Sequence, residues 1–121
     1  MAGVRNQAVG AYGERVAERY LGDLGMAILD RNWRCPEGEL DLVLRDGDVL
    51  VACEVKTRSS NAFGTPHEAI ADDKLARLQR LAVRWAAERL GVTAPAIRID
   101  LVAVLATGHG AAQVQHVRGL L

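Results

Sequence analysis

The feature that most constrains this fold is a pair of Val- and Leu-rich runs separated by the turn signal Asp46-Gly47. Apolar runs on either side of an Asp-Gly pair predict a β-hairpin. Three charged residues nevertheless stand within these runs, namely Asp41, Glu54 and Lys56. Charged groups in a half-buried strand are costly unless they are paired, hydrated or bound to a metal. The hairpin therefore predicts both a sheet and a place in it where charge must be compensated.

The turn determines which side chains share a face, provided that Asp46-Gly47 is a two-residue loop. In that register Asp41 faces Ala52, and Ala52, Glu54 and Lys56 lie on one face of their strand. Asp41 projects from the same face, diagonal to Glu54, at a backbone separation of roughly 7–8 Å that two carboxylate side chains can close. A loop one residue longer would turn Asp41 to the wrong face. The other face would carry core residues: Leu40, Leu42, Val51, Cys53 and Val55.

Two carboxylates and an ammonium group on one strand face suit a divalent cation. Mg²⁺ takes oxygen ligands, commonly one or two carboxylates together with waters and phosphate oxygens. Such an ion polarises a phosphate oxygen and lowers the pKa of an attacking water. Lys56 could orient that water or balance the charge that develops in the transition state. The alternative from residue types alone is an ion-pair ladder on a solvated hairpin face, and both interpretations stay open at this point.

The charged residues also follow a known pattern. Twelve residues separate Asp41 from the segment Glu54-Val55-Lys56. This spacing resembles the D-x(n)-E-x-K signature of the PD-(D/E)xK, or restriction-endonuclease-like, nuclease superfamily. Three longer segments carry a wider resemblance: Gly38-Glu39-Leu40-Asp41-Leu42, Val55-Lys56-Thr57-Arg58 and Phe63-Gly64-Thr65-Pro66. They resemble the bacterial YraN or UPF0102 family, predicted endonucleases similar to archaeal Holliday-junction resolvases. The resemblance runs from about residue 13 to about residue 104.

The resemblance implies an endonuclease that depends on Mg²⁺ or Mn²⁺ and acts on DNA, including branched or structured DNA. Asp41 and Glu54 would hold the metal, with help from the backbone carbonyl of Val55, and Lys56 would complete the catalytic set. Glu14 is a further metal ligand by resemblance, because the family has a Gly-Glu pair in its first helix. The alternative is that Glu14 is a solvated residue in the first turn of that helix, where the dipole favours a carboxylate.

Basic residues near the predicted site would contact the phosphates of a nucleic acid. The residues expected to do so are Arg34, Arg58, Lys74 and Arg77. Lys74 and Arg77 begin a basic stripe along a predicted helix, which could hold phosphates or could simply be a solvated face. Arg34 is the last residue of Arg31-Asn32-Trp33-Arg34, a segment that resembles the family's Arg-Asn-x-Arg. It could contact phosphate, or it could simply lie at the end of a strand and bind no ligand. Residues 59–66 predict a polar loop beside the site. No role is assigned to the histidines: His67, His109 and His116.

Hydrophobic periodicity predicts the order helix, three strands, helix, strand and a short last strand. Helices are expected over residues 11–24 and 72–90, and the last two strands over 96–106 and 114–117. The core face of the second helix is expected to consist of Leu75, Leu78, Ala82, Trp85 and Ala86. This order predicts an α/β fold with a mixed central sheet flanked by helices. It matches the αβββαβ order of the restriction-endonuclease-like core, so the resemblance implies the same fold.

Composition narrows the functional classes. The 121 residues are enough for one domain, which we expect to span residues 1–121. The formal net charge is zero, whereas general nucleic-acid binders are usually basic, so such a role requires a local basic patch. Cys35 and Cys53 form no CxxC pair, which fits a reducing compartment without a disulfide framework. No apolar run can span a membrane and no signal-peptide core is evident, so we expect a cytoplasmic protein.

Three functional classes remain open from the sequence. The first is the metal-dependent nuclease. The second is a nucleic-acid-binding or DNA-repair accessory protein that keeps the nuclease fold without catalysis. The third is a protein-interaction module whose strand charges are only a surface ladder, consistent with the zero net charge. A homodimer is expected by resemblance alone, because similar resolvases act as dimers.

Overall fold

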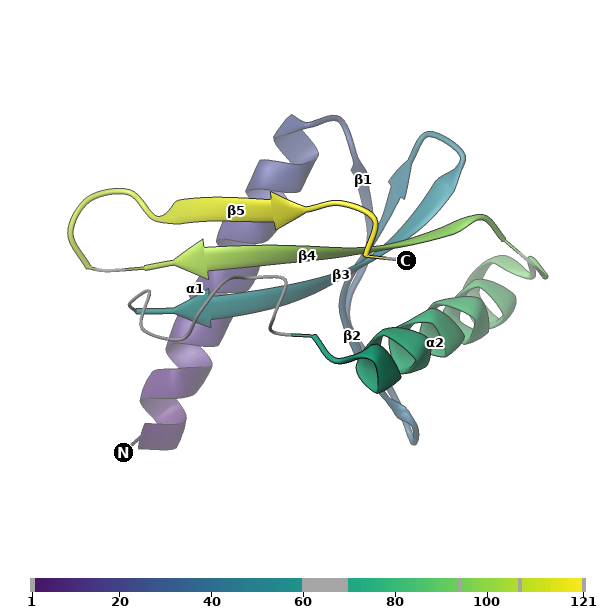
Figure 1. Ribbon diagram of the computed structural model, residues 1–121, viewed down its shortest axis with the longest axis horizontal. Coiled ribbons are helices and arrows are strands. Elements are labelled where there is room, and N and C mark those ends of the chain that lie inside the picture. Colours follow the sequence, from purple (N-terminus) through teal and green to yellow (C-terminus); the bar gives the residue numbers. More distant parts are fainter. Residues whose placement is uncertain (1, 60–69, 94, 107, 121) are drawn as a thin grey trace.

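Seven elements follow one another along the chain in the predicted order (Figure 1). They are α1 (Ala2–Asp23), β1 (Ala27–Cys35), β2 (Gly38–Asp46), β3 (Val49–Arg58), α2 (Asp72–Leu90), β4 (Ile97–Leu105) and β5 (Gln113–Val117). The structure is a computed structural model that describes residues 2–59, 70–93, 95–106 and 108–120, with side chains from residue 9 onward. Helix α1 begins at Ala2, earlier than the predicted start at residue 11.

The strands form one sheet in the order β1-β2-β3-β4-β5. Strands β3 and β4 are parallel, and the other neighbouring strands are antiparallel. Helix α2 lies in the connection between the two parallel strands, as a crossover requires. The predicted α/β fold with a mixed sheet flanked by helices is therefore confirmed. Neither described helix has the length and apolar character needed to cross a membrane.

The two helices cover opposite faces of the sheet and define two hydrophobic clusters. The α2 cluster contains the five core residues predicted for this helix, all of them buried. The α1 cluster contains Ala17 and Leu21 together with residues of β2, β3 and β4. Along β3, Val51 and Cys53 belong to the α1 cluster, whereas Ala52 belongs to the α2 cluster. Strand β3 is thus buried on both faces, which explains its nearly continuous apolar sequence.

The predicted hairpin is present, but its turn lies one residue further along the chain. Asp46 pairs with Val49, which leaves Gly47 and Asp48 as the two-residue loop. Gly47 has a φ of 60°, and a type II′ turn requires such a positive φ at its first loop position. The glycine therefore occupies the first position of the loop, whereas the sequence prediction had placed it second.

The shift changes the partner of Asp41, and the burial of β2 also departs from the prediction at one residue. The predicted pairing of Asp41 with Ala52 is wrong, because Ala52 pairs with Val43. Leu40 and Val43 pack in the α2 cluster, whereas Leu42 packs in the α1 cluster. The prediction that Leu40 and Leu42 share a face is therefore also wrong. Since residues two apart share a face in a regular strand, the alternation breaks at Asp41, where the β2–β3 ladder has ended.

A polar network around Asp100 links β2, β4 and β5 through side-chain contacts. Asp100 is fully buried and accepts hydrogen bonds from Arg98 Nε at 2.9 Å and from the Gly119 N–H at 3.0 Å. His116 Nε2 lies 2.8 Å from the same carboxylate, so this histidine has a structural partner. Arg98 also donates to Asp46 at 2.8 Å. Burial would raise the pKa of Asp100, but hydrogen bonds from Arg98, Gly119 and His116 hold that pKa below its ordinary value.

Replacing Asp100 should destabilise the protein strongly. We expect Asp100→Ala to lower the free energy of unfolding by about 3–5 kcal/mol, because it leaves Arg98 without its buried carboxylate partner. Urea unfolding measures this loss, and Asp48→Ala in the exposed turn should change it by less than about 0.5 kcal/mol. The Asp100 contribution is lost as the pH falls through the native pKa, so the two proteins should converge in acid. A loss no larger than that of Asp48→Ala would contradict the structural role.

Candidate functional site

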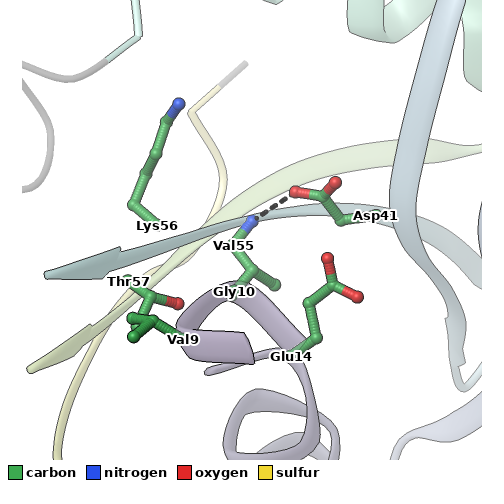
Figure 2. Close-up of a pocket in the computed structure, with 7 residues that line it drawn as sticks. All are labelled: Val9, Gly10, Glu14, Asp41, Val55, Lys56 and Thr57. Carbon is green, nitrogen blue, oxygen red and sulfur yellow. Dashed lines mark hydrogen bonds between the residues drawn. The ribbon is translucent and has the colours of Figure 1, made fainter. Parts of the chain in front are cut away.

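Asp41 lies at the place where β2 and β3 part. Its Oδ2 accepts a hydrogen bond of 2.9 Å from the backbone N–H of Val55 in β3 (Figure 2). Backbone N–H groups of a strand point in the plane of the sheet toward the neighbouring strand. The Asp41 carboxylate therefore replaces a main-chain acceptor of the interrupted ladder. The Asp41 side chain thus reaches across to the backbone of β3.

A cleft of about 240 Å³ opens beside Asp41. Its lining consists of Val9, Gly10, Glu14, Asp41, Val55, Lys56 and Thr57. Figure 2 shows Glu14 extending from α1 toward Asp41, while Lys56 extends from the opposite side of β3. The structure thus brings Glu14, whose site role the resemblance alone implied, into the same cleft as Asp41.

Gly13 explains how Glu14 reaches this cleft. A Cβ built on Gly13 would lie 1.7 Å from Thr57 Oγ1 and 2.8 Å from Thr57 Cβ. Such distances are shorter than any van der Waals contact, so α1 crosses β3 at a spacing that only glycine permits. The Gly-Glu pair therefore has a physical basis, since the first residue allows the approach and the second projects into the cleft.

Glu54 lies on the α2 side of β3, where two ammonium groups meet one of its oxygens. Lys74 Nζ, from the first turn of α2, is 2.6 Å from Glu54 Oε1, and Lys56 Nζ is 3.5 Å from the same atom. The Glu54 side chain is 10% exposed, and those of Lys56 and Lys74 are 34% and 29% exposed. Burial would lower the pKa of Lys74, but its hydrogen bond to Glu54 raises that pKa above the ordinary value. These three residues are called the lysine–glutamate cluster below.

The environment of Asp41 disfavours its charged form. Burial raises the pKa of Asp41 to about 7, and the negative charge of Glu54 adds to this effect. The hydrogen bond from Val55 acts in the opposite direction, while Glu14 and Glu39 raise the pKa further. Several carboxylates therefore act on one half-buried position, and the main-chain donor compensates only part of the charge.

The oxygen donors near Asp41 are of the kind that a hard divalent cation prefers. The carboxylates of Asp41, Glu54 and Glu14 and the backbone carbonyl of Val55 are all ligand types that Mg²⁺ and Mn²⁺ accept. The negative charge that raises the pKa of Asp41 is charge that a cation would neutralise. Within the described part of the chain, no three acidic, histidine or cysteine side chains lie close enough to hold a metal by themselves. A metal here would therefore also need water or substrate oxygens.

The predicted phosphate-contacting residues do not all lie at the site. Lys74 belongs to the lysine–glutamate cluster, and Arg77 is exposed in the next turn of α2. Arg34 donates to Glu39 at 3.0 Å, close to where β1 ends and β2 begins. Arg58 is the last residue of β3 and already has an interaction. The predicted polar loop, including the Phe63-Gly64-Thr65-Pro66 segment, and His67 lie outside the described residues.

Strand β1 has an unusual backbone conformation opposite Asp41, which the sequence did not predict. Asn32 has a φ of 51°, the single positive value among non-glycine residues in the described part of the chain. It stands between two paired residues of β1, Arg31 and Trp33, whose partners in β2 are Leu42 and Leu40. Asn32 is therefore located opposite Asp41, where the alternation of β2 breaks. Asparagine is among the few side chains that tolerate this backbone region, but that signal alone does not specify a site.

The fold and the site together define an α/β protein with carboxylates and a lysine pair where two central strands part. The family model described as "Uncharacterised protein family UPF0102" matches residues 13–104. The chain therefore belongs to the UPF0102 family, as the resemblance in its sequence indicated.

Similar proteins from three bacteria are named only as UPF0102 proteins. The protein from Nocardioides sp. is 61% identical over 114 residues, which cover 94% of this chain and 91% of that protein. The protein from Beutenbergia cavernae is 62% identical over 113 residues, covering 93% and 95%. The protein from Kineococcus radiotolerans is 58% identical over 113 residues, covering 93% of each chain. These names give the family and no activity.

Gly13→Ala tests the close approach of α1 to β3. We expect it to lower the free energy of unfolding by about 1–3 kcal/mol, because the new Cβ collides with Thr57. Gly10→Ala is the matched control in the same helix, since nothing lies within 4 Å of a Cβ at that position. The control should be neutral or slightly stabilising. Equal urea-unfolding midpoints for the two variants would contradict this account of Gly13.

Asp41→Asn should stabilise the metal-free protein in a pH-dependent way. The native pKa of Asp41, about 7, lies above the value in an unfolded chain, so wild-type stability falls as the pH rises between these values. In the presence of a chelator, we expect the variant to be more stable by about 2 kcal/mol near pH 8, with a smaller gain near pH 5. Urea unfolding at both pH values measures this difference. A gain independent of pH, or a loss near pH 8, would be inconsistent with the raised pKa.

Proposed function

We propose that this protein is a nuclease that uses Mg²⁺ or Mn²⁺ to hydrolyse phosphodiester bonds in DNA, with branched or structured DNA as its substrate. The observation that supports the proposal best is the placement of three residues around the gap between β2 and β3. Asp41 is held there by the Val55 N–H, and Glu54 and Lys56 stand together on the adjoining strand. Their order along the chain is that of the D-x(n)-E-x-K signature.

Each of these residues has a defined part in the proposed reaction. Asp41 and Glu54 would hold the ion with the Val55 carbonyl, and Glu14 would add a carboxylate from α1. A divalent ion held there would supply polarisation of the scissile phosphate and a more acidic water. Lys56 keeps its ammonium partly exposed, so it can reach a phosphate or the attacking water. Its positive charge would stabilise the negative charge that develops on the phosphate in the transition state.

The distribution of charge around the gap supports a phosphate-containing substrate. Glu14 approaches the gap from α1, whereas Lys56, Lys74 and the exposed Arg77 lie on the α2 side. An ion would bind between Asp41 and Glu54, and a DNA phosphate would approach from the α2 side. This arrangement supplies the local basic patch that a chain of zero net charge needs for a nucleic-acid role.

The proposal extends to the cellular setting of the protein. We propose the cytoplasm as its compartment and a homodimer as its working form. A single domain of 121 residues covers little of a branched DNA, and two copies would present two cleavage sites to it.

Cleavage assays test the proposed function directly. We expect Mg²⁺- or Mn²⁺-dependent cleavage of at least one substrate among duplex, nicked, flap and four-way-junction DNAs, with an RNA duplex to compare the two nucleic acids. Lys56→Ala and Asp41→Asn should each lower the rate by about 10²-fold or more, because each removes a group that acts on the transition state or the ion. Arg45→Ala is the control, since it removes an exposed cation close to the hairpin turn.

The outcomes separate the three functional classes. If Lys56→Ala and the wild type show the same background cleavage, the catalytic role is wrong. DNA binding that is insensitive to metal and to Asp41→Asn would instead indicate an accessory protein. Absence of both metal binding and DNA binding would favour a protein-interaction module.

A further inference from the structure

The lysine–glutamate cluster places two cations near one oxygen of the carboxylate that the proposed function assigns to the metal. Lys74 Nζ is 2.6 Å and Lys56 Nζ 3.5 Å from the same Glu54 Oε1. The shorter contact comes from α2 and not from the strand that carries Glu54. A largely buried carboxylate requires compensation of its charge, and Lys74 makes the closer of the two compensating contacts.

A divalent ion bound at Glu54 Oε1 would compete with the Lys74 ammonium, which contacts the same oxygen. The two cations would also repel each other at such short range. Lys74 is the residue that can move, because its ammonium ends a flexible four-carbon stem and its side chain is 29% exposed. Lys56 makes the longer contact and lies next to Val55 on β3, so it can stay near the site.

We infer that Lys74 is a placeholder for the metal: it holds Glu54 in the metal-free protein and is released when the ion binds. This inference rests on the proposed function and goes further than a phosphate contact by Lys74. The released ammonium would then be available to a phosphate of the DNA, together with Lys56. Lys74 would thus contact Glu54 before the ion binds and a DNA phosphate afterwards.

Metal binding and DNA binding should therefore favour each other. An ion with two positive charges neutralises Asp41 and Glu54, so the charges of Lys56 and Lys74 are no longer compensated by Glu54. They can then bind phosphate, and linkage requires that DNA tighten the binding of the metal by the same factor. The coupling should depend on Lys74 in particular, because its contact with Glu54 is the one that metal binding breaks.

Calorimetric titration of Mn²⁺ into the full-length protein tests the first half of the inference. Lys74→Met should bind Mn²⁺ about fivefold more tightly than the wild type, because the ion no longer displaces an ammonium group. Lys74→Arg keeps a cation beside Glu54 and should bind no more tightly than the wild type. Arg77→Met is the matched control, because it removes one positive charge from the next turn of α2 without touching the cluster, and it should change Mn²⁺ affinity much less.

DNA binding with and without Ca²⁺, which is used to limit turnover, tests the second half. For a four-way junction, Ca²⁺ should tighten binding to the wild type by about tenfold and binding to Lys74→Met by less than half that factor. Arg77→Met should weaken DNA binding equally with and without Ca²⁺, leaving the coupling unchanged. Unfolding curves for each variant show that the comparison is made between folded proteins.

The possible failures are distinguishable. If the wild type binds Mn²⁺ and Asp41→Asn does not, but Lys74→Met gains no affinity, the placeholder role is wrong and the proposed metal site stands. An equal gain in Lys74→Met and Arg77→Met would also overturn the placeholder role, because it would indicate only a general effect of charge. If the wild type binds no Mn²⁺, both the inference and the proposed function are wrong.

Discussion

The candidate site depends on the hydrogen bond from the Val55 N–H to the Asp41 carboxylate. It forms where the β2–β3 ladder has ended and where a charged side chain takes the place of a main-chain acceptor. Holding a carboxylate there is costly, as the pKa of Asp41, raised to about 7, indicates. A neutral side chain would lack this cost. Asp41 in its charged form therefore lowers the stability of the folded protein. Strongly perturbed groups of this kind occur preferentially at functional sites.

The two helices make different contributions around this hydrogen bond. Helix α1 approaches β3 closely at Gly13 and brings a carboxylate to the cleft. Helix α2 brings the ammonium group of Lys74 to Glu54. Strand β3 is buried on both faces and presents Glu54 to α2, while its backbone donates to Asp41. The separation of acidic and basic groups is therefore a consequence of the layered fold, in which each face of the sheet faces a different helix.

The sequence predicts the elements well, because helical spacing in α2 and the apolar runs of β2 and β3 are local signals. It does not locate the turn, since an Asp-Gly pair does not tell which residue begins the loop, and Gly47 takes the first position. The place of Asp41 depends on where the ladder ends, and the partner of Lys74 depends on how α2 docks on the sheet. Both are long-range properties, and the resemblance to UPF0102 proteins identified these residues without giving their contacts.

The proposed function requires Asp41 and Glu54 to hold one ion at the gap between β2 and β3. The most direct measurement is the anomalous scattering of a crystal grown with Mn²⁺. We expect one strong peak within ligand distance of a carboxylate oxygen of Asp41 and of Glu54, with the Lys74 ammonium displaced from Glu54. No peak at this gap, or a peak elsewhere while Lys74 remains on Glu54, would contradict the account.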